Sequence, residues 1–167
     1  QRGFLLKSAD GDPYVFFWDT APNLSATGKA PISLPESGIV DFTHPEAYAW
    51  WRDAHRQLFA DGVDVLLCDF GEQVPDDAVA SNGDRGRRLH NVYPLLYNKC
   101  VFEATKKFLP PESIPVVWGR AGWAGSQRYP VGWGGLPQSD WEGLAASLRG
   151  GLSWGMSGGP YHSSDIG

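Results

Sequence analysis

An apolar run that ends abruptly at an aspartate limits the folds open to this chain more than any other feature. Residues 63–68 are mainly valine, leucine and cysteine, and they are followed at once by Asp69, Phe70, Gly71 and Glu72. Near-continuous apolar runs are typical of parallel strands that are covered on both faces. In a β/α barrel, a carboxylate at the C-terminal end of such a strand lies on the face where catalysis takes place. Asp and Gly are also common in turns, so this segment alone leaves Asp69 open as a turn residue or as an active-site carboxylate.

Strand-like and helix-like segments alternate along the chain. Apolar side chains recur every three or four positions in the stretches expected to be helical, which are residues 45–60, 90–108 and 140–149. Strands are expected at residues 38–42, 63–68, 114–118 and 152–156. This order predicts an α/β fold with a parallel sheet, namely a partial (β/α)8 TIM barrel made of central βα units only. A doubly wound open sheet would share the alternation, but no G-x-G-x-x-G turn follows the early strands, which disfavours a dinucleotide-binding fold.

Turn and capping residues set the ends of the predicted elements. The turn Asp10-Gly11-Asp12-Pro13 precedes an alternating aromatic segment, so we expect a hairpin within residues 1–18 and a loop over residues 19–38. Thr43 is expected to cap the first helix, and Ser139 the third.

The length of the chain bounds its domain organisation. A closed eight-stranded barrel typically needs about 250 residues, and this sequence has 167. We therefore expect a fragment of a single (β/α)8 catalytic domain, with residues 1–38 as a loop and hairpin excursion and residues 39–167 as consecutive βα units. The absence of an initiator methionine points the same way.

Charge and composition exclude several classes of partner. The formal net charge is −5, from 14 basic and 19 acidic residues, which argues against a nucleic-acid partner. No stretch approaches the length of a membrane span, so no membrane partner is expected. The sequence gives no sign of a signal peptide, so the cytoplasm is the slightly favoured expectation for the compartment. Two cysteines, Cys68 and Cys100, make neither a disulfide framework nor a metal site, and we expect no metal and no cofactor.

Polar side chains follow the predicted strands at the end where a barrel carries its site. Asp69 and Glu72 follow one strand, Arg120 follows the next, and Asp165 lies near the end of the chain. A guanidinium holds carboxylates and sugar hydroxyls well, so Arg120 suits substrate binding, an ion pair that orients Asp69 or Asp165, or both roles together. Eight Trp, eight Phe and six Tyr suit a cleft that stacks sugar rings, although aromatic side chains also fill cores.

The motifs in this order resemble glycoside hydrolase family 31, the family of α-glucosidases and α-xylosidases. The segments that carry the resemblance are Asp69-Phe70-Gly71-Glu72, His90-Asn91-Val92-Tyr93, residues 120–131 from Arg120 to Val131, Trp133-Gly134-Gly135, residues 147–153 and Asp165-Ile166-Gly167. The resemblance runs through nearly the whole chain and implies the middle of the catalytic (β/α)8 barrel.

The resemblance also implies roles for individual residues. Asp69 matches the catalytic nucleophile, and Arg120, Trp133 and Asp165 match substrate-binding positions. A retaining glycosidase needs an ionised carboxylate aimed at the anomeric carbon, and a nearby arginine favours that ionised form. Glu72 is expected to support the site through a hydrogen bond or an ion pair.

The position of the general acid/base departs from the family pattern. The family carries Asp after Trp-Gly-Gly, whereas this chain carries Leu136, and leucine can neither protonate a leaving oxygen nor activate water. Positioned proton transfer contributes typically about 10²–10⁴-fold in rate. Asp140 is the candidate substitute acid, although it is expected in the first turn of a helix, where an acidic side chain favours the helix dipole.

The resemblance implies a retaining α-glycosidase that hydrolyses terminal α-glucosides or α-xylosides through a covalent glycosyl-aspartate intermediate, impaired by Leu136. A catalytically inactive carbohydrate-binding homologue and a transglycosidase of the same family stay open as alternatives. The expected partner is an α-linked glycoside or oligosaccharide, and an oligomer is possible.

Overall fold

The computed structural model describes residues 2–16 and 36–165. The loop predicted for residues 19–38 lies almost entirely outside the described residues, as does the end of the aromatic segment after Phe16. The expected hairpin is present in its described part, where Lys7 and Pro13 form an antiparallel bridge across the predicted turn. Strand β1 (Val15–Phe16) then pairs antiparallel with β2 (Ser37–Gly38). The strand predicted at residues 38–42 is largely wrong, because only Gly38 lies in a strand and Val40 forms a single antiparallel bridge with Leu5, outside the parallel sheet. A turn closed by the His44 N–H, which donates to the Asp41 carbonyl, ends the segment.

Four short parallel strands form the main sheet, in the order β3-β4-β5-β6. They are β3 (Leu66–Cys68), β4 (Val117–Gly119), β5 (Gly132–Trp133) and β6 (His162–Ser163). Each strand pairs with the one before it in the chain, so the order never reverses as it does in a doubly wound sheet. This is the arrangement predicted for consecutive units of a barrel.

The first predicted helix is present as two pieces, α2 (Pro45–Ala54) and α3 (Arg56–Ala60), which meet at His55. Its cap is His44 and not Thr43, because the Thr43 hydroxyl instead donates to the Asp41 carboxylate over 2.6 Å. The His44 Nδ1 accepts hydrogen bonds from the backbone N–H groups of Glu46 and Ala47.

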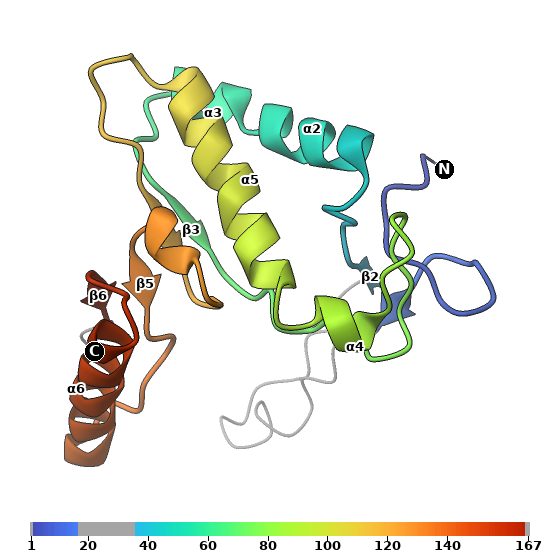
Figure 1. The fold of residues 1–167 in the computed structure, drawn as a ribbon. Helices are drawn as coiled ribbons and strands as arrows, with labels where there is room; N and C mark the ends of the chain where they lie inside the picture. The colour runs from blue at the N-terminus through green and yellow to red at the C-terminus, as the bar shows by residue number, and fades with distance from the viewer. Residues whose placement is uncertain (1, 17–35, 166–167) are drawn as a thin grey trace, which may run out of the picture.

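Helix α5 (Tyr93–Phe108) connects the two halves of the molecule. Figure 1 shows it crossing the middle, with α2 and α3 on one side and the sheet on the other. It begins three residues later than predicted, after the short helix α4 (Gly86–Leu89), and His90 lies in the intervening turn. There the His90 ring Nδ1 lies 2.7 Å from the Val74 carbonyl oxygen, which ties the loop after β3 to the start of α5.

The strand predicted at residues 152–156 is wrong. These residues continue helix α6 (Trp141–Met156) without a break, and the helix therefore extends well past the predicted end at residue 149. Apolar side chains at Leu144, Leu148 and Leu152 keep the four-residue spacing of a helix across Gly150 and Gly151. The strand that follows is β6. Residues 119–138, for which neither a helix nor a strand was predicted, contain a 3₁₀ turn (Ser126–Arg128) and β5.

Two apolar clusters hold these elements together. One joins the N-terminal segment to α5 and includes Leu6, Ile39, Phe42 and Tyr93. The other seals α5 against the sheet through Cys68, Val101 and Val117, all of which are almost fully buried. The C-terminal end of β3 is therefore packed tightly against α5 and β4. No helix in the described part of the chain is both long and apolar enough to cross a membrane.

Candidate active site

Asp69 follows the last residue of β3 and lies at the C-terminal end of the parallel sheet. The backbone N–H of Arg120 donates to the Cys68 carbonyl over 3.0 Å, which extends the pairing of β3 with β4 by one step. Asp69 and Arg120 are therefore carried to the same end of neighbouring strands. The Asp69 side chain is about one third exposed, at 36%, so it is anchored in the protein and still open to a ligand.

The Arg120 guanidinium bridges two carboxylates. Its Nη1 lies 2.7 Å from Oδ1 of Asp69, and its Nη2 contacts Oε1 of Glu72. Of the two roles that the sequence allowed for Arg120, the ion pair with Asp69 is present, and contact with a sugar stays a prediction. With two carboxylates and one guanidinium, this end of the sheet carries a net negative charge.

A sharp reversal of the chain follows Asp69. Phe70 has φ of 64° and Gly71 has φ of 104°, so two successive residues adopt the left-handed conformation. Residues with a Cβ rarely adopt the φ of Gly71, so this reversal suits glycine. The Asp69 Oδ1 accepts a hydrogen bond from the Phe70 N–H over 2.8 Å. Among the described residues no hydrogen bond reaches Oδ2, which is therefore the oxygen available to a substrate.

Trp133 and Asp165 meet across β5 and β6. The Trp133 indole N–H donates to Oδ1 of Asp165 over 2.9 Å, and Trp133 itself is buried. Trp118 makes a similar contact one strand away, where its indole N–H donates to the Ser163 hydroxyl over 2.8 Å. The two predicted substrate-binding side chains therefore lie in one hydrogen-bonded layer at the strand ends.

Leu136 lines a cavity of about 660 Å³. Its side chain is 78% exposed, and the cavity also contains Ser164 and Asp165. The preceding Gly135 lies beside the aliphatic part of the Arg120 side chain. A Cβ built on this glycine would be 3.5 Å from the arginine Cδ. The loop that carries Leu136 is thereby held next to the arginine that pairs with Asp69.

Asp140 is occupied as a helix cap. It is the N-cap of α6, in place of the predicted Ser139, and its Oδ1 accepts a hydrogen bond from the Gly143 N–H over 2.7 Å. Asp140 also lines the cavity beside Leu136, so it shares that space although its carboxylate is engaged.

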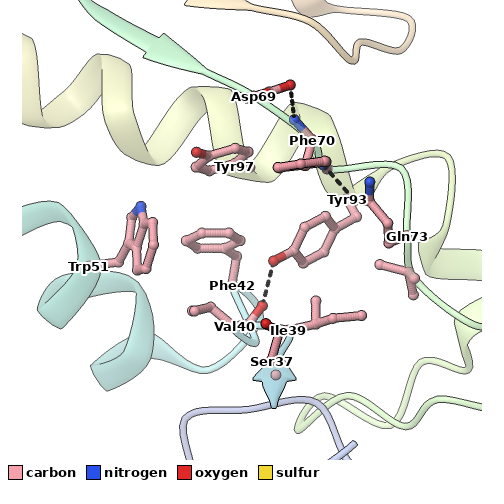
Figure 2. A pocket seen from close by; sticks show the side chains of 13 residues that line it. Ser37, Ile39, Val40, Phe42, Trp51, Asp69, Phe70, Gln73, Tyr93 and Tyr97 are labelled. Atoms are coloured by element: carbon pink, nitrogen blue, oxygen red, sulfur yellow. Dashed lines mark hydrogen bonds between the residues drawn. The ribbon is translucent and has the colours of Figure 1, made fainter. Parts of the chain in front are cut away.

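A second cavity, of about 330 Å³, is lined by Asp69 itself, which does not line the cavity beside Leu136. Figure 2 shows its aromatic wall, which consists of Phe42, Trp51, Phe70, Tyr93 and Tyr97. Burial raises the pKa of the Tyr97 phenol well above its usual range, and that of the Cys68 thiol to about 12, so both groups stay neutral beside Asp69. Among the described residues, no three or more His, Cys, Asp or Glu side chains are grouped to hold a metal ion.

The sequence did not reveal the part that Phe70 plays in this site. Its ring lies under the Arg120 guanidinium, with 4.7 Å between Cζ and the ring centroid. An aromatic residue seldom adopts a left-handed backbone, so nothing in the residue type announces this geometry. The only sequence hint is the glycine that follows it at the end of a strand.

Comparison with known proteins identifies the family. The whole chain, residues 1–167, matches the glycosyl hydrolases family 31 TIM-barrel domain. It is 38% identical over its full length to an α-xylosidase of Emericella nidulans and 34% identical to a sulfoquinovosidase of Escherichia coli, and it covers 20% and 23% of those proteins. The fold resembles a family 31 sulfoquinovosidase from E. rectale, solved with an aza-sugar inhibitor, with a TM-score of 0.80, 32% identity, and coverage of 99% of this chain and 24% of that one. The chain thus spans about a fifth to a quarter of the length of these relatives, and it belongs to glycoside hydrolase family 31, as part of the TIM-barrel domain.

Proposed function

We propose that the protein carrying this chain is a retaining α-glycosidase acting on terminal α-glucosides or α-xylosides, with Asp69 as the nucleophile. The observation that supports this most directly is the anchoring of Asp69. One carboxylate oxygen is fixed by the Phe70 N–H and by Arg120, while the other has no hydrogen bond among the described residues. A carboxylate held in this way can direct its second oxygen at an anomeric carbon.

In the first step, Oδ2 of Asp69 forms a bond to the anomeric carbon as the bond from that carbon to the leaving group breaks. The transition state resembles an oxocarbenium ion. The net negative charge of Asp69, Glu72 and Arg120 together suits the positive charge that develops on the sugar. Trp133 and Asp165 are proposed to bind hydroxyls of the same sugar.

The second step requires water to attack the glycosyl-aspartate, with help from a general base. The family position for this base and for the earlier acid is Leu136, which has no proton to give or take. Asp140, the substitute considered from the sequence, already accepts a hydrogen bond from the Gly143 N–H as a helix cap, and we propose no proton transfer by it. The proposed enzyme therefore handles activated leaving groups far better than alkoxides, because activated groups depart without protonation.

A 5-fluoro glycosyl fluoride tests the nucleophile in the full-length protein. Fluoride leaves without an acid, so the lack of a carboxyl at position 136 does not prevent labelling. We expect the peptide that contains Asp69 to gain the mass of one fluorinated glycosyl group. Label on any other residue would refute the role of Asp69.

Leu136→Asp tests the role of position 136. We expect hydrolysis of an aryl α-glucoside or α-xyloside to rise by about 10²-fold or more, because a positioned carboxyl again supplies proton transfer. Leu136→Asn is the matched control, since it has similar size and polarity but cannot exchange a proton in this way, and it should leave the rate low.

The exposed Leu136 also favours a second candidate, a sugar-binding homologue without catalysis. In that case Leu136→Asp would not raise the rate, and the fluorinated reagent would bind without labelling Asp69.

A further inference from the structure

We propose that Phe70 is a positioning residue of the active site, which holds the Arg120 guanidinium in place against Asp69. The proposal rests on the proposed function of Asp69 as the nucleophile. Phe70 has two roles in the proposal. Its backbone reverses the chain so that Glu72 reaches Arg120, and its ring contacts the Arg120 guanidinium.

The backbone of Phe70 is in an unfavourable region for a side chain of this kind. Its φ of 64° places it in the left-handed region, and it is the sole residue other than glycine with positive φ among the described residues. Left-handed backbone at a residue with a Cβ persists where the surroundings enforce it, and such residues cluster at active sites. Here the reversal brings Glu72 back to the same arginine that Asp69 contacts.

The ring of Phe70 supplies a contact that the two carboxylates cannot. Asp69 and Glu72 contact different terminal nitrogens of Arg120, so both pairs engage the edge of the guanidinium. The Phe70 ring lies against it 4.7 Å from Cζ, as in a cation–π pair. The ring is 42% exposed and also lines the cavity of about 330 Å³ beside Asp69.

Asp69 and Glu72 compete for the one Arg120 guanidinium, so a contact that fixes the guanidinium also fixes Asp69. If the guanidinium swings toward Glu72, Asp69 loses the partner that fixes Oδ1 and with it the direction of Oδ2. A misplacement of about 1 Å can cost about 10²-fold in rate. The Phe70 ring restricts that swing, so its loss should slow the bond-forming step without weakening substrate binding.

Labelling kinetics of the full-length protein with a 5-fluoro α-glucosyl or α-xylosyl fluoride test this inference. In this reaction an Asp69 oxygen bonds to the anomeric carbon while the C–F bond breaks and fluoride departs with its electron pair. The measured quantities are the maximal labelling rate, the half-saturating reagent concentration and the labelled peptide. For Phe70→Leu we expect the maximal rate to fall about tenfold or more and the half-saturating concentration to stay within about twofold.

Aromatic and arginine variants separate positioning from packing. Phe70→Tyr and Phe70→Trp should restore most of the rate, because both keep a ring under the guanidinium. In an Arg120→Lys background, Phe70→Leu should have little further effect, because Phe70 acts through the arginine. Phe108→Leu is the matched control, since it removes a ring that lies 4.7 Å from the Arg56 guanidinium, at the last residue of α5, and it should leave the labelling rate unchanged.

The possible outcomes are distinct. Label on a residue other than Asp69, or no label in the wild type, overturns the proposed function and the inference with it. Label on Asp69 at equal rates in wild type and Phe70→Leu overturns the inference alone. So does a slow Phe70→Leu that neither aromatic variant restores, because the residue would then serve only to fill space.

Discussion

Cys68 directly precedes Asp69, yet its thiol belongs to the core and not to the site. Burial raises the pKa of the Cys68 thiol to about 12, and likewise that of Cys100. Because the thiolate is the reactive form, the native protein should react with iodoacetamide at pH 8 about a thousandfold more slowly at these residues than after unfolding. Peptide mapping of alkylation with and without guanidinium chloride measures this. Rapid alkylation of Cys68 in the folded protein would contradict its burial between α5 and β3.

The same thiols predict how stability depends on pH. Their pKa is raised in the folded state, so the folded protein holds more protons than the unfolded chain between about pH 9 and pH 12. The stabilisation is complete below the ordinary thiol value and is lost as the pH rises through that window. The free energy of unfolding, from urea titrations between pH 8 and pH 11, should fall with pH, and Cys68→Ala should make the fall shallower.

The position of a site residue was predictable from sequence where the residue directly follows a predicted strand. Asp69 and Arg120 each come just after an apolar run, and parallel strands bring such residues to one edge. Phe70 was not predictable in this way, because its contact with Arg120 depends on a backbone conformation that its residue type disfavours.

At the scale of elements, the start of α6 decides the role of Asp140. Its carboxylate caps the helix through the Gly143 N–H, and asparagine caps as well as aspartate does. Asp140→Asn should therefore leave both stability and hydrolysis unchanged, whereas Asp140→Ala should lower the free energy of unfolding by about 0.5–2 kcal/mol. Chemical denaturation and an aryl glycoside assay measure the two effects. Loss of activity in Asp140→Asn would instead make Asp140 the substitute acid.

The helices were easier to predict than the strands. The spacing of apolar side chains identified α2, α3 and α5 within a few residues, because a long amphipathic pattern repeats over several turns. The apolar runs 63–68 and 114–118 predicted β3 and β4, but β5 and β6 are only two residues long, which is too short for a pattern, and neither was predicted. Residues 152–156 were predicted as a strand after a helix that ends at residue 149, whereas they continue α6, and Trp154 within them packs beside Gly132 and Gly159.

At the scale of the whole molecule, the described sheet has an open edge at β3 and another at β6. The chain spans about a fifth to a quarter of its relatives' length. We propose that residues 1–38 and 39–167 belong to one catalytic domain, in which further βα units pair with both edges. Open edges and uncovered apolar faces favour association, so the 167 residues alone should behave differently from the full-length protein.

An apolar stripe on α6 makes this difference measurable. None of the residues of α6 is buried, and the stripe consists of Trp141, Leu144, Leu148, Leu152 and Met156, each at least 60% exposed. Contiguous exposed apolar surface of this kind drives association, so residues 1–167 alone should self-associate in light scattering as their concentration rises. Leu148→Glu with Leu152→Glu should reduce that association, whereas Ile114→Glu, at a position 83% exposed but outside the stripe, should not.

In the full-length protein the same double change should lower the free energy of unfolding, because there we expect neighbouring barrel elements to cover the stripe. A full-length variant as stable as the wild type would show that the stripe faces solvent, and the barrel would then have to close without contacting it.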